Sequence, residues 1–201
     1  MKKRSSLFKI GIFAIILMTL CSGCSLNCSE NKEKFKVGME CSYAPFNWIQ
    51  PSNLNGAVGI SGGWYACGYD VYMANRIAQS LGKELEIVKV DWDGLLPALT
   101  SGKIDAIIAG MSATEERKQT IDFTNNYYDS NIVIVTKKDS PYAQAKNLSD
   151  LSGAKITGQL STVHYGLIDQ IPNVNKQLWQ EQRSRGYGWI IPRSLQSGAI
   201  I

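Results

Sequence analysis

Residues 104–117 of the chain have the sequence IDAIIAGMSATEER, and this stretch indicates the type of fold. The run from Ile104 to Ala109 is almost continuously apolar, which is typical of a strand buried on both faces of a sheet. Gly110 follows directly, and Thr114 with two glutamates after it is a favourable start for a helix. The stretch therefore predicts a buried strand, a tight loop and a helix N-terminus, as found in α/β proteins.

The same alternation of strands and helices continues on both sides of this stretch. The predicted elements are, in order, strand 35–39, a loop over 41–46, a turn or hairpin over 51–63, helix 68–81, strand 85–90, a helix from Asp91 or Asp93 to Gly102, strand 104–109, a helix from Thr114, strand 131–136, strand 155–158 and helix 164–171. We expect Asp70 to cap helix 68–81 and Gly82 to end it. Its apolar face is formed by residues at helical spacing: Met73, Ile77, Ala78 and Leu81.

This order of elements predicts an α/β fold with mostly parallel strands. In such sheets, ligands bind at the carboxyl ends of the strands. Three loops then become candidates for a binding site: Glu40–Phe46, Gly110–Arg117 and Gln159–Thr162.

The N-terminus has the pattern of an export signal. Its first nine residues, MKKRSSLFK, carry four cations, and the apolar run Ile10–Leu20 is shorter than the roughly 20 residues that span a bilayer. The run ends at LCSGC, where small residues before Cys24 resemble the lipobox of bacterial lipoproteins. We therefore predict a lipoprotein signal peptide at 1–23, lipidation of Cys24 and a polar tether at 24–35. An ordinary signal peptide cut elsewhere is the alternative.

Removal of this signal peptide changes the charge balance. The whole chain has a net charge of +4, but residues 1–23 carry four cations and no acid, so the 21 Lys and Arg drop to 17 and equal the 17 Asp and Glu. A neutral mature chain gives no indication of a nucleic-acid partner.

No metal site, cofactor site or catalytic set is predicted. Cys28, Cys41 and Cys67 match no metal-binding spacing, and His164, the only histidine, forms no recognisable triad. Export permits a Cys41–Cys67 disulfide, and small buried thiols are the alternative.

The loop after the buried strand combines several groups that favour an anion. Gly110 lets a ligand approach the backbone, Ser112 offers a hydroxyl and an amide, and Arg117 offers a planar fork that fits a carboxylate. In the alternative interpretation, Arg117 pairs with Glu115 or Glu116 on a solvated face.

Aromatic residues and one acid lie near the other strand ends. Tyr43, Phe46 and Trp92 fit either a sandwich around a ligand or ordinary core packing. Glu40, at the end of the first strand, fits either a partner for a cationic ligand group or a surface acid.

Four motifs in register resemble family 3 of the bacterial solute-binding proteins, the polar amino-acid receptors of ABC importers. They are VGME with YAPF at 37–46, GYDV at 68–71, WDGLLPAL with GKIDAI at 92–107, and MSAT with Arg117 at 111–117. The resemblance covers residues 36–172, although Tyr72 stands where the family usually has an acid. It implies the periplasmic-binding-protein type II two-lobed fold, with lobe 1 at 36–129 and an incomplete second lobe at 130–201.

The resemblance also implies roles for individual residues. Tyr43 and Trp92 match the family's aromatic sandwich, and Glu40 lies where members that bind basic amino acids use an acid. The α-carboxylate clamp matches Gly110, Ser112, Arg117 and, from the second lobe, Thr162. We expect binding of a free polar amino acid, with a weak preference for a basic one, and no enzymatic activity.

The same resemblance implies partners and a location. The protein would deliver its ligand to an ABC importer permease from the periplasm or the outer face of the cytoplasmic membrane, where a lipid anchor holds it. The alternatives are a dehydratase-like enzyme using Glu40, a sensory or decoy lipoprotein, and a non-functional truncated fragment.

The family pattern is lost after Leu178 and partly returns at the end. Residues 179–193 do not fit it, whereas LQSGAI at 195–200 parallels LTSGKI at 99–104 and is expected to precede a second-lobe strand. We interpret this as a truncated or frame-disrupted chain, and we expect weak binding at best from it.

Overall fold

The computed structural model describes residues 32–178 and 197–200, and from Glu33 onward these belong to one compact unit. The predicted signal peptide, Cys24, most of the tether and the stretch that loses the family pattern lie outside the described residues.

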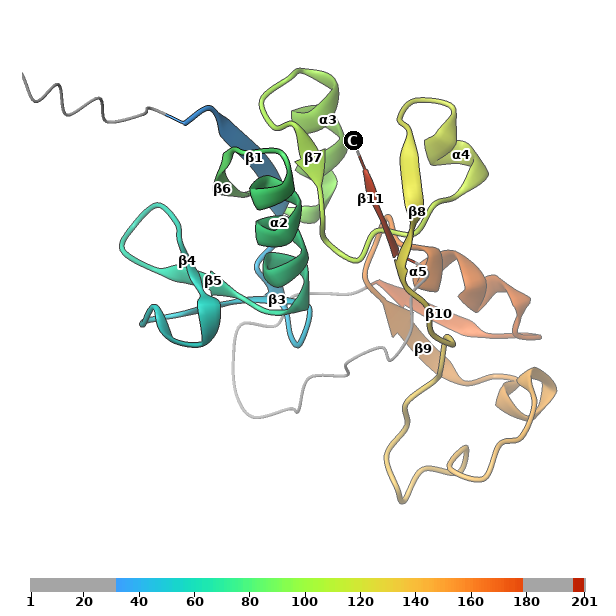
Figure 1. Cartoon of the computed structure of the whole chain (residues 1–201). Helices are drawn as coiled ribbons and strands as arrows, with labels where there is room; N and C mark the ends of the chain where they lie inside the picture. The colour runs from blue at the N-terminus through green and yellow to red at the C-terminus, as the bar shows by residue number, and fades with distance from the viewer. Residues whose placement is uncertain (1–31, 179–196, 201) are drawn as a thin grey trace, which may run out of the picture. The chain divides into compact units, whose positions relative to one another are not determined.

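The central sheet has five strands in the order β6-β1-β7-β11-β8 (Figure 1). They are β1 (Lys34–Met39), β6 (Glu84–Lys89), β7 (Ala106–Ile107), β8 (Phe123–Tyr128) and β11 (Ser197–Ile200). β1 pairs in parallel with both β6 and β7, with Val37 opposite Ile87 and Ala106. The strands predicted at 35–39, 85–90 and 104–109 are therefore confirmed as neighbours in one parallel arrangement.

Alternate residues around β7 pack into two cores. Ala106 and Ile108 join the core that includes helix α2 (Tyr69–Ser80), whereas Ile107 and Ala109 join the core that includes helix α3 (Leu95–Thr100). The 3-10 turn η2 (Trp92–Gly94) leads directly into α3. Each of these four side chains is at most 3% exposed, which confirms that the apolar run predicted a strand buried on both faces.

Glycines end both helices, as predicted. Gly82 (φ +68°) and Gly102 (φ +72°) adopt the left-handed conformation, which glycine reaches without a Cβ penalty. After α2, Gly82 N–H donates to the Gln79 carbonyl and Lys83 N–H donates to the Ala78 carbonyl, the bond pattern of a Schellman motif.

The prediction for the start of α2 is wrong. Its N-cap is Gly68, whose side chain contributes no cap, and Asp70 lies inside the first turn with 0% exposure. The Asp70 carboxylate accepts hydrogen bonds from Asn47 and Tyr127 and is therefore committed to tertiary contacts. The predicted apolar face is also shifted, because Val71 and Ala74 are buried while Leu81 is 54% exposed.

A second, antiparallel sheet has four short strands in the order β2-β3-β5-β4. They are β2 (Ser42–Tyr43), β3 (Asn47–Gln50), β4 (Val58–Gly59) and β5 (Tyr65–Cys67), with the 3-10 turn η1 (Leu54–Gly56) before β4. The hairpin predicted over 51–63 is confirmed by the β4–β5 pair, but the loop predicted over 41–46 contains β2.

The structure favours small buried thiols over a disulfide. Cys41 and Cys67 are free and buried. Cys41 precedes β2 and Cys67 lies in β5, so β3 separates them by two strand spacings, about 9.5 Å. A disulfide needs Cα atoms within about 7 Å.

The strand–loop–helix predicted after residue 150 is confirmed. It consists of η3 (Leu148–Leu151), β9 (Lys155–Gly158), α5 (Val163–Leu167), η4 (Ile168–Gln170) and β10 (Asn175–Leu178), in which β9 and β10 pair in parallel. A small core of Leu151, Ala154 and Ile171 lies beneath them.

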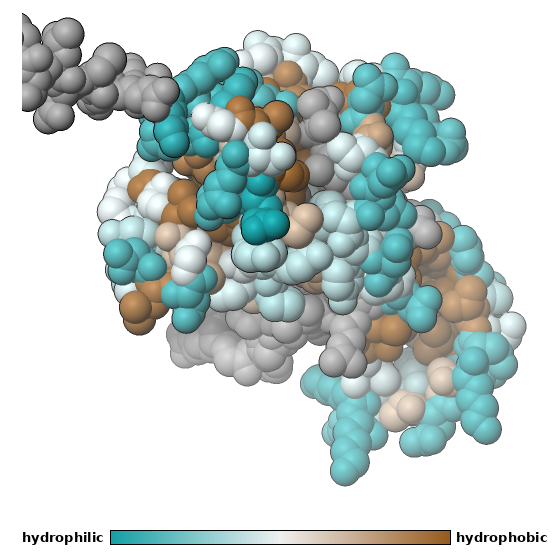
Figure 2. Space-filling model, in the orientation of Figure 1, coloured by the Kyte–Doolittle hydropathy of each residue, from teal (hydrophilic) through white to brown (hydrophobic). Residues whose placement is uncertain are grey.

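Two predictions near the second lobe are wrong. Residues 131–136 form no strand, because a strand needs a hydrogen-bonded partner and the described residues provide none beside them. Ile132 to Val135 are 43–49% exposed, and Figure 2 shows hydrophobic patches on an otherwise largely hydrophilic face. Residues 197–200 form β11 of the central sheet instead of preceding a second-lobe strand, because β7 and β8 offer backbone groups that pair with it.

Candidate ligand-binding site

The loop after β7 changes direction at Gly110 and leads to a short helix. Gly110 is buried with φ +63°, and helix α4 (Glu115–Lys118) begins five residues later. Thr114 Oγ1 accepts a hydrogen bond from the Arg117 N–H at 3.2 Å, so the predicted N-cap is confirmed. Ser112, Thr114 and Arg117 are all half-buried, which leaves their polar groups near the surface of this loop.

The Arg117 guanidinium is held by backbone carbonyls. Nη1 donates to Ser112 O at 2.8 Å, and Nη2 donates to Ser161 O at 2.9 Å. Burial lowers the pKa of Arg117, and the charge of Glu116 opposes that shift. Glu115 forms its ion pair with Lys118, at 2.8 Å, and not with Arg117. A guanidinium has five N–H donors, so Arg117 keeps donors for another acceptor besides the two carbonyls.

Trp92 lies beside Arg117. The Arg117 Cζ is 5.6 Å from the centroid of the Trp92 ring, within the range of a cation–π contact. Trp92 Nε1 donates to the same Ser161 carbonyl at 3.1 Å. Ser161 has φ +58°, an uncommon conformation for a residue other than glycine, and it turns this carbonyl to serve two donors.

Tyr43 belongs to a cluster of aromatic rings. It stacks on Phe46 with centroids 5.0 Å apart, and Phe46 meets Tyr128 edge to face at 5.0 Å. Phe46 is 6% exposed, which agrees with core packing, whereas Tyr43 keeps partial exposure. Burial raises the pKa of Tyr43 to about 12, so its hydroxyl stays neutral.

Glu40 contacts the loop that follows β9. Gln159 Nε2 donates to both carboxylate oxygens, at 3.2 and 3.4 Å. Burial raises the pKa of Glu40, the hydrogen bonds from Gln159 and Ser42 oppose this, and the negative charges of Asp91 and Asp93 add to it. Glu40 is therefore a half-buried acid in a negative environment, unlike a solvated surface acid.

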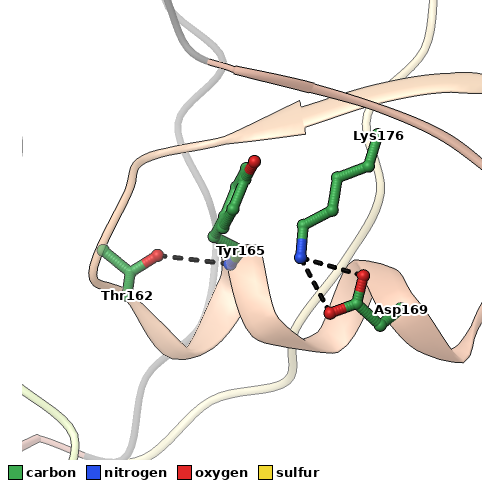
Figure 3. Close-up of polar contacts among 4 residues, drawn as sticks. All are labelled: Thr162, Tyr165, Asp169 and Lys176. Carbon is green, nitrogen blue, oxygen red and sulfur yellow. Dashed lines mark hydrogen bonds and ion pairs between the residues drawn. The ribbon is translucent and has the colours of Figure 1, made fainter.

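Thr162 caps helix α5 (Figure 3). Its Oγ1 accepts from the Tyr165 N–H at 3.3 Å and donates to Gln159 O at 2.6 Å. The helix is fastened to β10 by Lys176, whose Nζ lies 2.8–2.9 Å from both carboxylate oxygens of Asp169 and 4.1 Å from the centroid of the Tyr165 ring (Figure 3).

The three loops chosen from the sequence therefore meet. Glu40 of the first loop contacts Gln159 of the third, and Arg117 of the second contacts Ser161 of the third. This agrees with the rule that sites form at the carboxyl ends of strands, here β1, β7 and β9.

Two groups that support these loops belong to the predicted third loop but give no individual signal in the sequence. Ser161 and Gln159 act through a carbonyl and an amide, which leave no pattern in the sequence. Asp70 did leave a signal, because it lies four residues before Ala74 on the buried face of α2, where an acid must find partners.

Two classes of site find no support in the part of the chain that the structure describes. No three His, Cys, Asp or Glu side chains there come together as metal ligands do. None of the helices described has the length and hydrophobicity of a membrane span.

Comparison with known proteins finds similar sequences and structures for most of the chain. Residues 35–185 match the family model of bacterial extracellular solute-binding proteins, family 3. A probable histidine-binding protein of Campylobacter jejuni is 35% identical over 181 residues, which cover 88% of this chain and 65% of the relative. The arginine-binding extracellular protein ArtP of Bacillus subtilis is 32% identical over 73% of this chain and 51% of its own length.

Solved structures show the same similarity. A crystal structure of the substrate-binding protein of an amino acid ABC transporter superposes with a TM-score of 0.60 at 36% identity, over 73% of this chain and 60% of that chain. The chain thus spans about half to two thirds of the length of the proteins it resembles.

Proposed function

The chain belongs to the bacterial extracellular solute-binding proteins, family 3, and from this we propose that it binds a free amino acid outside the cytoplasm for delivery to an ABC importer. Its fold is the periplasmic-binding-protein type II fold, of which the chain contains a part. The similar proteins are named as binding proteins, which supports binding over catalysis.

The observation that carries this proposal is the position of Arg117. Its guanidinium is half-buried and fixed by two backbone carbonyls, and it stands against the Trp92 ring. A carboxylate fits the remaining donors of such a fork. We assign the α-carboxylate of the ligand to Gly110, Ser112, Arg117 and Thr162. In this set Gly110 allows the ligand to approach the backbone closely, because its own N–H donates to Tyr127.

The acidic side of the site supports a basic ligand. Burial raises the pKa of Glu40, and the negative charges of Asp91 and Asp93 add to this and attract a cation. Trp92 and Tyr43 would contact the aliphatic part of the side chain. The proposed ligand is therefore an amino acid with a cationic side chain, and Glu40 pairs with that cation.

Titration calorimetry tests this proposal with arginine, lysine, histidine, glutamine and cystine. We expect saturable binding of a basic amino acid, weaker than micromolar because the chain contains only part of the fold. Arg117→Ala should abolish it, since a charge-assisted hydrogen bond contributes about 1.5–3 kcal/mol. Lys118→Ala, on the exposed side of α4, is the control and should bind as the unmodified chain does.

The results can contradict the proposal in two ways. If none of the five amino acids gives saturable heats, the binding function is wrong. If Arg117→Ala binds like Lys118→Ala, the assignment of the carboxylate site is wrong. Submicromolar affinity would instead contradict the expectation that a chain with only part of the fold binds weakly.

We propose that Cys24 anchors the protein to the outer face of the cytoplasmic membrane, with signal peptide 1–23 and tether 24–35. Lobe 1 at 36–129 and a partial second lobe at 130–201 complete the proposed organisation. Palmitate labelling should be lost in Cys24→Ser and kept in Cys28→Ser, and equal labelling of both variants would refute the anchor. Adjacent permease and ATPase genes would favour transport over a sensory or decoy role.

A further inference from the structure

A chain of four hydrogen bonds runs through the buried part of this unit and ends at two residues of the proposed ligand loops. Cys41 N–H donates to Asn47 Oδ1 at 2.8 Å, and Asn47 Nδ2 donates to Asp70 Oδ2 at 2.7 Å. On the other side, Gly110 N–H donates to Tyr127 Oη at 3.1 Å, and that hydroxyl donates to Asp70 Oδ1 at 2.7 Å. Asn47 and Asp70 are 0% exposed.

One end of the chain fixes the direction of its bonds. The Cys41 N–H can only donate, so Asn47 accepts through Oδ1 and turns its Nδ2 donor toward Asp70. On the other side, the Tyr127 hydroxyl accepts from the Gly110 N–H and donates to Asp70 when that carboxylate is ionised. An ionised Asp70 therefore accepts from both sides and joins the two halves of the chain.

The two ends lie where the ligand loops leave the sheet. Cys41 (φ +59°) follows Glu40 after β1, and Gly110 (φ +63°) begins the loop that carries Ser112 and Arg117 after β7. Both residues have left-handed backbone conformations that redirect the chain. For Cys41, such a conformation costs about 1 kcal/mol and persists when its surroundings enforce it.

We propose that Asp70 is a positioning residue for the ligand site, which holds the Cys41 and Gly110 amides through Asn47 and Tyr127 and so sets the directions of both ligand loops. The inference rests on the proposed function, because it assigns Asp70 a role in that site. It adds a group that touches no ligand and lies on α2, a helix that supplies none of the proposed contacts.

Protonation of Asp70 provides a switch for the experiment. Burial raises its pKa to about 6, against the hydrogen bonds from Tyr127 and Asn47. Besides Tyr127, which donates to it, Asp70 acts on the thiol of Cys41 and the hydroxyl of Tyr43, whose pKa values of about 11 and 12 lie far above this range. Glu40, which precedes Cys41, has its pKa raised by burial, and the Gly110 side of the chain therefore gives the clearer signal from Asp70. Protonation removes the negative charge that both donors face, and the bond to Tyr127 then reverses so that the Asp70 O–H donates to the hydroxyl.

The test follows backbone amides by ¹⁵N NMR between pH 7 and pH 4.5 in the protein alone. We expect the amides of Cys41, Gly110, Ser112 and Arg117 to shift together with a midpoint near pH 6. Tyr127→Phe should remove the shift at Gly110, Ser112 and Arg117 while leaving that of Cys41. Tyr72→Phe is the control, because it removes a hydroxyl from the exposed side of α2, the helix that carries Asp70. This variant should behave as the unmodified chain does.

Arginine binding at the same pH values gives the functional arm. We expect about ten-fold weaker binding at pH 7 in Tyr127→Phe, as for one lost hydrogen bond. At lower pH, protonation of Glu40 also weakens binding, because burial raises the pKa of Glu40 and this acid pairs with the ligand cation. Amides that do not titrate near pH 6, or a Tyr127→Phe variant that binds arginine at pH 7 as tightly as the unmodified chain does, would overturn the proposal. Titrating loop amides in a chain that binds no amino acid would support positioning by Asp70 and contradict the proposed function instead.

Discussion

Gly68 shows how closely one residue can determine the position of a buried acid. Its φ of +128° is reached by few residues other than glycine, and a Cβ there would overlap the Phe46 carbonyl. That carbonyl accepts the Asp70 N–H at 2.8 Å, so a larger residue would push the start of α2 away from the Phe46 loop.

We expect Gly68→Ala to lower the free energy of unfolding by roughly 3 kcal/mol or more, because conformational strain and a backbone overlap add together. Gly63→Ala is the matched control, since Gly63 has φ +77° but no atom near its Cβ position, and should cost about 1 kcal/mol. Urea unfolding measures both. Equal losses would show that the Phe46 overlap is relieved without cost.

The buried Asp70 should also give the stability a pH dependence. Its pKa rises from 3.8 to about 6 on folding, so the protonated form is favoured in the folded state. Stability from this group is fully present below about pH 4 and is lost as pH rises to about 6, by on the order of 3 kcal/mol.

Urea unfolding of the chain and of Asp70→Asn at pH 4, 5, 6 and 7 measures this effect. The difference between the two should change over that range and become constant above pH 6. A constant difference from pH 4 to 7 would contradict the raised pKa of Asp70.

The local signals in the sequence were accurate where a residue acts on its own backbone. Thr114 capping α4 and Gly82 ending α2 follow from chain-local chemistry. Asp70 was assigned to the same chemistry and instead pairs with residues 23 and 57 positions away. Tertiary packing determines such partners, and it cannot be predicted from residue type and spacing alone.

Among the elements, α5 and the turn η4 after it share one lysine of the neighbouring strand β10 as a contact. Lys176 contacts Asp169 and the Tyr165 ring, and its side chain is 22% exposed. Because Asp169 is 67% exposed, solvent screens the pair and limits its contribution.

Lys176→Met keeps the aliphatic stem and removes the charge. We expect it to lower the unfolding free energy by about 1 kcal/mol and to increase amide exchange in α5. Lys118→Met removes the exposed pair with Glu115 and should cost less than about 0.5 kcal/mol. Unchanged amide exchange in α5 would contradict this and show that other contacts, such as the Thr162 cap, hold the helix.

The segment 131–136 was the clearest error among the elements. NIVIVT has a strong strand pattern, but strand formation requires a partner that composition does not reveal. The run at 104–109 has a similar composition and was predicted correctly, because β1 lies beside it in the same sheet.

An exposed apolar segment of this kind favours association between molecules. We expect light scattering to show concentration-dependent association of the chain, and Val133→Lys to reduce it. Leu54→Lys changes an exposed leucine in η1 and should leave association unchanged. Equal effects of both variants would point to general surface hydrophobicity.

At the scale of the molecule, the sequence predicted which loops meet better than it predicted the sheets. The three loops follow from the order of strands and helices, and contacts from Glu40 and Arg117 to residues 159 and 161 bring them together. The antiparallel sheet of β2 to β5 was mostly missed, because its strands have two to four residues and too little alternation to predict.

The exposed backbone of residues 131–139 has a further consequence, for digestion by proteases. Proteases hold their substrates as extended chains. Residues 131–137 belong to no helix or strand, and every residue from 131 to 139 is exposed. We expect brief treatment with subtilisin to cut there first, before the hairpin over 51–67, and mass spectrometry of the earliest products locates the cut. A first cut inside the hairpin would contradict this. Cleavage at 131–139 would leave two pieces that end near the proposed boundary between the lobes, and separation under denaturing conditions would allow each to be studied by itself.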